Sequence, residues 1–320
     1  MMKESGKSRG QVLMLVEKSS HCLSFYDRKT TERLNSIALP RFSHEIAVTA
    51  DRGHAYVAHY GVRTSADAGD GGTSIAVVDL AACKVSHLID CRPYGRLHGI
   101  ALDGHGRLLV LSEAQNVLLS FDDPLTATAP SRAVASGGLK SHLFAVSGDG
   151  TAAYCCNLLS HTVTKVSPRD ATIAPIAISP GERPEGLWLS PDGDMLYVAN
   201  RLSDTLVAIE TASMTIVKRM ATRRDPLRIY GMSRGRLLVA NCGDRSISVV
   251  DAETMRELAV MPLGGIPLAA HIRGETAFIS LTGDTCAEVD LSRLAVVSTF
   301  WTNCEPDSCF LLDPSMTGTA

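Results

Sequence analysis

The sequence lacks the features that mark several protein classes. Its 320 residues carry a formal net charge of -3, and aromatic residues make up only 5% of them. That balance gives no basic surface for nucleic acid or for an anionic membrane. No apolar run approaches the ~20 residues that a transmembrane helix needs. The amino terminus, MMKESGKSRG, has no apolar signal segment, so we predict a disordered leader over residues 1–10 and a cytoplasmic protein.

Paired-cysteine motifs and the common nucleotide or hydrolase motifs are also missing. Nine cysteines is an odd number, and none of them lies in a CxxC pair. Without an export signal we expect reduced, mostly buried thiols, including the adjacent Cys155 and Cys156. The chain has no phosphate-binding glycine loop, no GxSxG elbow and no HExxH helix, which argues against P-loop NTPases, α/β-hydrolases and zincin proteases.

What the sequence does contain is a repeated unit rich in short strands. Residues 184–210, PEGLWLSPDGDMLYVANRLSDTLVAIE, contain two apolar strands around a Pro-Asp-Gly turn, then a loop and a third strand. Similar segments begin near residues 13, 147 and 235. A self-similar unit of this kind is typical of a β-propeller, in which each repeat forms one four-stranded blade.

Alignment of the repeats predicts seven blades and a closed ring. Six complete blades run from Ser43 to Cys91, Leu97 to Ser136, Ser141 to Ser179, Pro184 to Thr222, Pro226 to Pro262 and Pro267 to Thr302. Gln11–Leu39 supplies only three strands, whereas the tail Pro306–Asp313 is an innermost strand without a blade. We therefore predict that the tail pairs beside Val12–Val16, which removes open sheet edges. Residues 11–320 then form a single all-β domain.

The template repeat also resembles a known family. SPDGDMLYVAN at residues 190–200, followed by a strand that ends in an acidic residue, resembles the YVTN-type β-propeller repeat. That family is related in fold to the seven-bladed lactonase-like proteins. The match is sharp at residues 190–200, good at 237–241 and looser elsewhere, although the blade pattern covers nearly the whole chain. The resemblance implies the propeller fold, but one fold hosts many activities, so it implies little about function.

The candidate site follows from the register of the repeats. The residue just before each innermost strand should project into one mouth of the central channel. In ring order these positions hold Asp307, His44, His98, His142, Glu185, Leu227 and Leu268, with Arg228 as the alternative to Leu227. Histidine is only 10 of 320 residues, so three histidines among seven equivalent positions is a strong enrichment.

These residue types predict a metal site. Neutral imidazoles with a carboxylate suit a divalent transition ion such as Zn, Fe, Mn or Cu, and open coordination positions admit water or substrate. We predict His44, His98 and His142 as ligands. Glu185 is either a ligand or the partner that orients a ligand histidine, and Asp307 is a further candidate. A polar channel that binds nothing and metal-free histidine acid–base chemistry are the alternatives.

Other residues are expected on the same face of the ring. Gly61–Gly72, GVRTSADAGDGG, is a long polar insertion that we predict to be a flexible lid. His59 is a candidate for proton transfer or a structural residue, and Arg228 is a candidate anchor for a substrate carboxylate. Positions equivalent to His59 at the end of each second strand include Glu17, Glu113, Asn157, Asn200 and Asn241. We expect the three asparagines to cap turns.

The function that this pattern predicts is metal-dependent catalysis on a small organic molecule in the channel. Lewis-acid chemistry of a lyase or hydrolase, with Glu185, His59 and Arg228 as catalytic candidates, is the first hypothesis. The resemblance to lactonase-like propellers implies oxygen-rich calcium sites, whereas this site is nitrogen-rich. That departure keeps a non-heme iron oxygenase as an alternative, and a non-catalytic protein-binding scaffold is another. No nucleic-acid or membrane partner is predicted.

Overall fold

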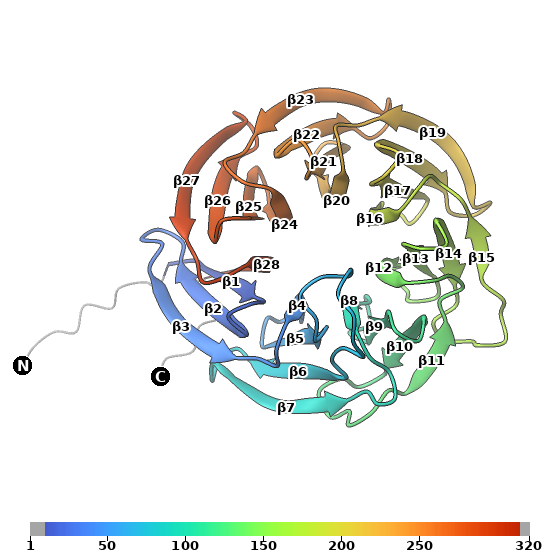
Figure 1. Ribbon diagram of the computed structural model, residues 1–320, viewed down its shortest axis with the longest axis horizontal. Helices are drawn as coiled ribbons and strands as arrows, with labels where there is room; N and C mark the ends of the chain where they lie inside the picture. Colours follow the sequence, from blue (N-terminus) through green and yellow to red (C-terminus); the bar gives the residue numbers. More distant parts are fainter. Residues whose placement is uncertain (1–9, 314–320) are drawn as a thin grey trace, which may run out of the picture.

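The computed structural model describes residues 10–313, which form a ring of seven four-stranded antiparallel sheets (Figure 1). This confirms the predicted all-β, seven-bladed propeller. The predicted leader lies outside the described residues except for its last residue. Within residues 10–313, no helix is long and apolar enough to cross a membrane.

Each blade is a simple meander that starts at the axis and ends at the rim. In ring order, the innermost strands are β28 (Pro306–Leu312), β4 (Ser43–Val48), β8 (Leu97–Leu102), β12 (Ser141–Val146), β16 (Pro184–Leu189), β20 (Pro226–Met232) and β24 (Pro267–Arg273). The second strands are β1 (Val12–Glu17), β5 (His54–His59), β9 (Leu108–Ser112), β13 (Ala153–Asn157), β17 (Met195–Asn200), β21 (Arg236–Asn241) and β25 (Thr276–Leu281).

The outer half of each blade is also regular. The third strands are β2 (Cys22–Asp27), β6 (Ser74–Asp79), β10 (Val117–Phe121), β14 (Thr162–Val166), β18 (Thr205–Glu210), β22 (Ser246–Asp251) and β26 (Thr285–Asp290). The rim strands are β3 (Arg33–Ala38), β7 (Lys84–Asp90), β11 (Arg132–Ala135), β15 (Ile176–Ile178), β19 (Thr215–Ala221), β23 (Arg256–Pro262) and β27 (Ala295–Trp301).

The ring closes as predicted, through the two ends of the chain. β28 is the innermost strand of the first blade and pairs with β1, with Val12 opposite Leu312 and Met14 opposite Phe310. The first blade therefore combines one strand from the end of the chain with three from its beginning.

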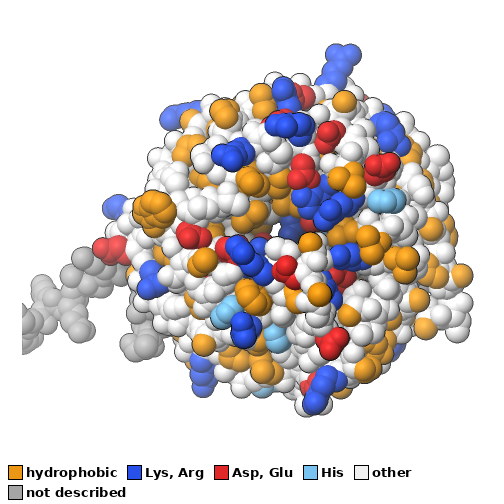
Figure 2. Space-filling view, in the orientation of Figure 1, with side chains coloured by type: hydrophobic (Ala, Val, Ile, Leu, Met, Phe, Trp, Pro, Cys, Tyr) orange, Lys and Arg blue, Asp and Glu red, His pale blue; other side chains and the backbone are white. Residues whose placement is uncertain are grey.

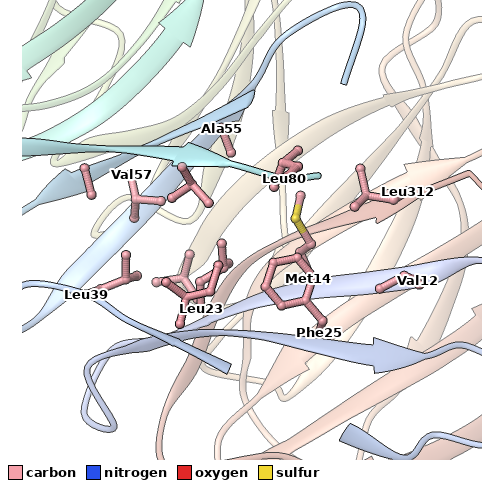
Figure 3. Packing of buried hydrophobic residues seen from close by; sticks show 13 residues of the cluster. Val12, Met14, Leu23, Phe25, Leu39, Ala55, Val57, Leu80 and Leu312 are labelled. Carbon is pink, nitrogen blue, oxygen red and sulfur yellow. The ribbon is translucent and has the colours of Figure 1, made fainter. Parts of the chain in front are cut away.

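The hydrophobic core lies between neighbouring blades rather than at the axis. Figure 3 shows Met14 and Phe25 of the first blade packed toward Val57 and Leu80 of the second, with Leu312 of the closing strand beside them. The middle strands are buried on both faces, so they carry almost continuous apolar runs such as VLMLV in β1. Stability is thus distributed over seven interfaces between blades.

The cysteines are free, and most of them are buried. Cys155 and Cys156 lie side by side in β13, where burial raises the pKa of the Cys155 thiol to about 12. A buried thiol with a raised pKa is a poor nucleophile, so this pair contributes to packing. Cys304 is the exposed exception.

Candidate functional site

A repeated turn directs one side chain of each blade toward the axis. Six innermost strands are preceded by a non-glycine residue in the left-handed region, with φ between 52° and 59°, two positions before the predicted site residue. These residues are Phe42, Arg96, Lys140, Arg183, Asp225 and Glu305. The pairing register then shifts within the strand, for example between Ser141 and Leu143. A bulge leaves the intervening residue unpaired and re-aims its side chain.

This turn brings the predicted site residues together. His44, His98, His142, Glu185 and Asp307 all line one cavity of about 150 Å³. Leu227 and Leu268 complete the ring on its apolar side, as the alignment of repeats predicted, and Arg228 also reaches the cavity. Figure 2 shows one face of the ring with a hollow at its centre and charged side chains around it.

The imidazole ring of His98 contacts those of both His44 and His142. His98 and His142 stack with centroids 3.7 Å apart, and the ring of His44 lies edge-on to His98 at 5.2 Å. Tyr60, just beyond the end of β5, packs against His44 and His98, in each case with ring centroids 4.8 Å apart. Tyr60 was not identified from the sequence, because the comparison of repeats considered the last residue of each second strand and not the one after it. Lys18 and Arg201, the residues that follow β1 and β17, also line the cavity.

Burial keeps two of these rings neutral. It lowers the pKa of His44 to about 3, with the charge of Lys18 acting in the same direction. Burial also lowers the pKa of His98 well below its ordinary value, helped by repulsion from His142 and His44. Near neutral pH both rings therefore offer an unprotonated nitrogen, which is the form that binds a metal or accepts a proton.

His142 is oriented by a buried carboxylate. Its Nδ1 lies 2.7 Å from Glu113 Oε2, and Glu113 Oε1 accepts hydrogen bonds from the Tyr60 hydroxyl (2.8 Å) and from Arg96 Nε (2.9 Å). Burial alone would raise the pKa of Glu113. The hydrogen bond and charge of His142, together with Tyr60 and Arg96, lower this pKa by more, so it lies below its ordinary value. Glu113 is therefore ionised and fixes the orientation of His142. The other ring nitrogen of His142, Nε2, lies 3.7 Å from Glu185 Oε1.

The two predicted carboxylates also have partners. Arg201 donates to Glu185 at 2.8 Å and forms a second ion pair with Asp225. Burial raises the pKa of Glu185, but the charges of His142 and Arg201 lower it overall, so this carboxylate is ionised. Asp307 Oδ2 lies 3.4 Å from His44 Nδ1 and 3.5 Å from Lys18 Nζ.

The gathered side chains do not by themselves form a coordination sphere. Among residues 10–313, no group of three or more His, Cys, Asp or Glu side chains has a geometry that could hold a metal ion. His44 Nε2 is 3.1 Å from the carbonyl oxygen of Val62, and the rings of His98 and His142 are stacked face to face. One buried nitrogen, His98 Nδ1, has no hydrogen-bond partner among the described residues.

Two catalytic candidates lie differently from the expectation. His59 does not line the cavity: its Nδ1 is 3.1 Å from Ser74 Oγ, and a Cβ on Gly72 would lie 2.3 Å from its ring. It is packed beneath the insertion, so the structural interpretation of His59 holds and proton transfer by it is not supported. Arg228 does face inward, but it spans the channel to Glu45, with Nη2 2.6 Å from Oε1.

The three asparagines have the structural role expected of them. Each is fully buried at the end of its second strand, and its amide group donates to a hydroxyl of the third strand in the same blade. The contacts are Asn157 to Thr162 (3.1 Å), Asn200 to Thr205 (3.1 Å) and Asn241 to Ser248 (2.9 Å).

The insertion at residues 61–72 covers the cavity, and it is fastened there. Arg63, Thr64 and Ser65 line the cavity. Arg96 Nη1 donates to the carbonyl oxygens of Asp67 (2.9 Å) and Gly69 (3.2 Å), and Lys140 Nζ donates to that of Ser65. The sequence predicted a loose lid, whereas opening of this one requires these hydrogen bonds to break.

Replacement of residues 62–71 by a short glycine–serine turn should open the site. We expect diethyl pyrocarbonate to modify His44 and His142 about tenfold faster, because a shielding loop limits access to the cavity. Site-resolved mass spectrometry of metal-free protein measures the rates, and the exposed His105 is the internal control. Unchanged rates at His44 and His142 would show that the insertion does not shield them.

Comparison with known proteins supports the fold. No protein-family model and no curated protein sequence matches the chain. Hydrazine synthase from Kuenenia stuttgartiensis has a similar structure, with a TM-score of 0.70 and 15% identity over 93% of this chain and 94% of that one. Dihydro-heme d1 dehydrogenase NirN in complex with DHE gives a TM-score of 0.66 and 12% identity over 96% and 76%.

At these identities the similarity shows the fold and not the reaction. The seven-bladed propeller is thus supported by its structural neighbours, whereas membership of the YVTN family is not confirmed by any family match.

Proposed function

We propose that this chain is a metal-dependent enzyme that acts on a small organic molecule in the histidine cavity, by lyase- or hydrolase-type chemistry. The observation that carries the proposal is the convergence of three imidazoles and two carboxylates, each from a different blade, on one cavity of about 150 Å³. Such a nitrogen-rich set suits a divalent ion such as Zn, Fe or Mn.

An unpaired buried nitrogen supports a cation at this position. Among the described residues His98 Nδ1 has no hydrogen-bond partner, and the 3.7 Å between His142 Nε2 and Glu185 Oε1 is too long for a hydrogen bond. Buried polar atoms are normally paired, and a cation at His98 Nδ1 would supply the partner that this nitrogen lacks. Glu113 holds His142 in the way that carboxylates commonly hold metal-bound histidines. His44 would have to exchange its contact with Val62 O for coordination.

The protein's own residues would then divide the remaining tasks. When bound, the ion supplies a Lewis acid that polarises a substrate oxygen or lowers the pKa of a water. Glu185, kept ionised by Arg201, is placed to accept a proton from the substrate or the water. Leu227 and Leu268 pack against the apolar part of a substrate and exclude water on that side. Arg228 also lines this cavity, but its charge is compensated by Glu45.

A second candidate, metal-free acid–base catalysis, is favoured by the contact between His142 and Glu113. A histidine whose Nδ1–H is held by an ionised carboxylate at 2.7 Å, with Nε2 toward a cavity, has the arrangement of a general base. Here His142 would move the proton and Tyr60 would help to fix Glu113.

Elemental analysis of protein purified without a metal-binding tag tests the proposal. We expect about one equivalent of ion per chain, either as isolated or after anaerobic dialysis against Zn²⁺, Mn²⁺ or Fe²⁺. A His105→Ala variant, altered at an exposed histidine, should keep the same content. Retained zinc or manganese favours the lyase or hydrolase, and retained iron favours the oxygenase. Protein that takes up no ion would refute the metal site and leave the His142–Glu113 base.

A further inference from the structure

A second and larger cavity occupies the rest of the axial channel. Its volume is about 440 Å³, and all seven innermost strands line it beyond the positions that form the histidine cavity. Arg228 is the one residue that lines both cavities, so the two are separate compartments on either side of it. A concave site of this size, with walls that combine apolar side chains and polar groups, is within the range that holds small organic molecules.

The walls of this second cavity are built from fixed aromatic rings. Trp188 lies directly on the backbone of Gly231, where a Cβ would be 2.2 Å from the indole, so only glycine permits this approach. Tyr197 packs against the same indole with centroids 5.8 Å apart. Phe310 stands against His271 at 4.6 Å. These rings present flat surfaces that favour an aromatic or other planar apolar ligand.

The end of the cavity beside Arg228, its inner end, has hydrogen-bond donors that lack an acceptor among the described residues. Arg228 donates to Glu45 through Nη2, but its buried Nε has no partner among the described residues. Both oxygens of Glu45 are already engaged, one by Arg228 and one by Ser308. The Tyr230 hydroxyl accepts a hydrogen bond from the Ala270 N–H at 2.7 Å, so its proton is available to a ligand.

The surrounding charge favours an anion. Arg228 and Glu45 are the only Asp, Glu, Lys or Arg side chains that line the cavity, and they compensate each other. His271 in the wall is neutral near pH 7, because burial lowers its pKa to about 4. Outside the lining, Arg52, whose guanidinium lies 5.8 Å from the Phe310 ring centroid, shares the single carboxylate of Asp313 with Arg273. This group of three side chains carries one excess positive charge, and the end of the cavity beside Arg228 offers unpaired donors.

We propose that the second cavity binds a planar organic carboxylate. Its apolar body packs against Trp188 and Phe310, and its carboxylate accepts hydrogen bonds from Arg228 Nε and the Tyr230 hydroxyl. This site is separate from the proposed metal site, because none of the predicted metal ligands lines the second cavity and the two linings share only Arg228 among the described residues.

Fluorescence of Trp188 provides the test. The chain has two tryptophans, and Trp301 is 77% exposed on the rim, so a Trp301→Phe variant leaves Trp188 as the only reporter. We expect 2-naphthoate to change its emission saturably at one molecule per chain, with a Kd on the order of 100 µM. The isosteric but neutral 2-naphthamide should bind about tenfold more weakly, because charge-assisted hydrogen bonds are the stronger ones.

Variants assign the contacts. The pair Glu45→Gln with Arg228→Met removes both charges together, so the preference for naphthoate over naphthamide should fall from about tenfold to about the threefold that Tyr230 supplies. Tyr230→Phe, which preserves the ring, should weaken naphthoate about threefold or more and serves if the double variant does not fold. His98→Ala with His142→Ala should leave naphthoate binding unchanged. Non-saturable binding, equal affinities for the two probes in the parent, or loss of binding in the histidine variant would overturn the proposal.

Discussion

A chain that ends at Glu305 is expected to be insoluble or to lack fixed side-chain packing. The deletion removes β28, whose backbone pairs with β1 along the channel side of the first blade. It also removes Cys309, Leu311 and Leu312, which are buried between blades. Each buried leucine is worth about 1.5–3 kcal/mol, and a whole domain has only about 5–15 kcal/mol of stability. The exposed edge of β1 would in addition favour association between chains.

Near-ultraviolet circular dichroism, size-exclusion chromatography and urea unfolding measure this effect. A synthetic peptide with the sequence of residues 306–320, added during refolding of the truncated chain, is the control and should restore the native signal. Cooperative unfolding of the truncated chain, with the same midpoint as the full chain, would show that β28 is dispensable for the ring.

The fold could be predicted from the sequence because the same local signals recur in every blade. Val12–Val16 was predicted where β1 spans Val12–Glu17, and the predicted blade from Pro226 to Pro262 begins and ends with β20 and β23. Turn residues and apolar runs act over a few neighbouring residues, so they are visible in the sequence itself. The repeat then supplied the register, which correctly gathered three histidines and two carboxylates around one cavity.

The contacts that tune the site could not be predicted, because they join residues that are distant in the sequence. Tyr60 of the second blade and His142 of the fourth bond to Glu113 of the third, and Arg96 reaches Glu113 within the third blade; no local pattern encodes these hydrogen bonds. The repeat alignment placed Glu113 with the asparagines, but the pairing register makes Ser112 their equivalent, and Glu113 is the residue that follows β9. The six residues in the left-handed region that precede innermost strands could not be recognised in the sequence, because none of them is glycine. Tertiary packing, not propensity, maintains such conformations.

The orientation of the histidine rings is likewise a tertiary property. The sequence predicted that His44, His98 and His142 would point toward the channel, and they do. Whether their nitrogens meet depends on side-chain torsions, which follow from contacts such as His44 with Val62 O and His142 with Glu113. The insertion shows the same dependence: its composition predicted flexibility, but Arg96 and Lys140 fasten it.

Replacement of His98 and His142 together by alanine is expected to reduce bound metal at least tenfold while the ring stays folded. Both side chains are buried at the mouth of the channel, and neither belongs to the apolar clusters between blades. The loss of two ligands from a set of four or five removes most of the affinity for a transition ion. The fold should lose only about 1–3 kcal/mol per site, chiefly because Glu113 is left with one donor fewer.

A conservative pair separates the metal effect from the structural one. His142→Gln can still donate an amide N–H to Glu113, and His98→Asn keeps a polar group of similar shape, so this variant should melt close to the parent. It should nevertheless retain far less zinc or manganese in elemental analysis, because amide groups are poor ligands for borderline ions. His105→Ala is the control with full metal content. Stoichiometric metal in a folded His98→Ala, His142→Ala protein would place the ion outside the histidine cavity and would leave His142 with no metal-binding role.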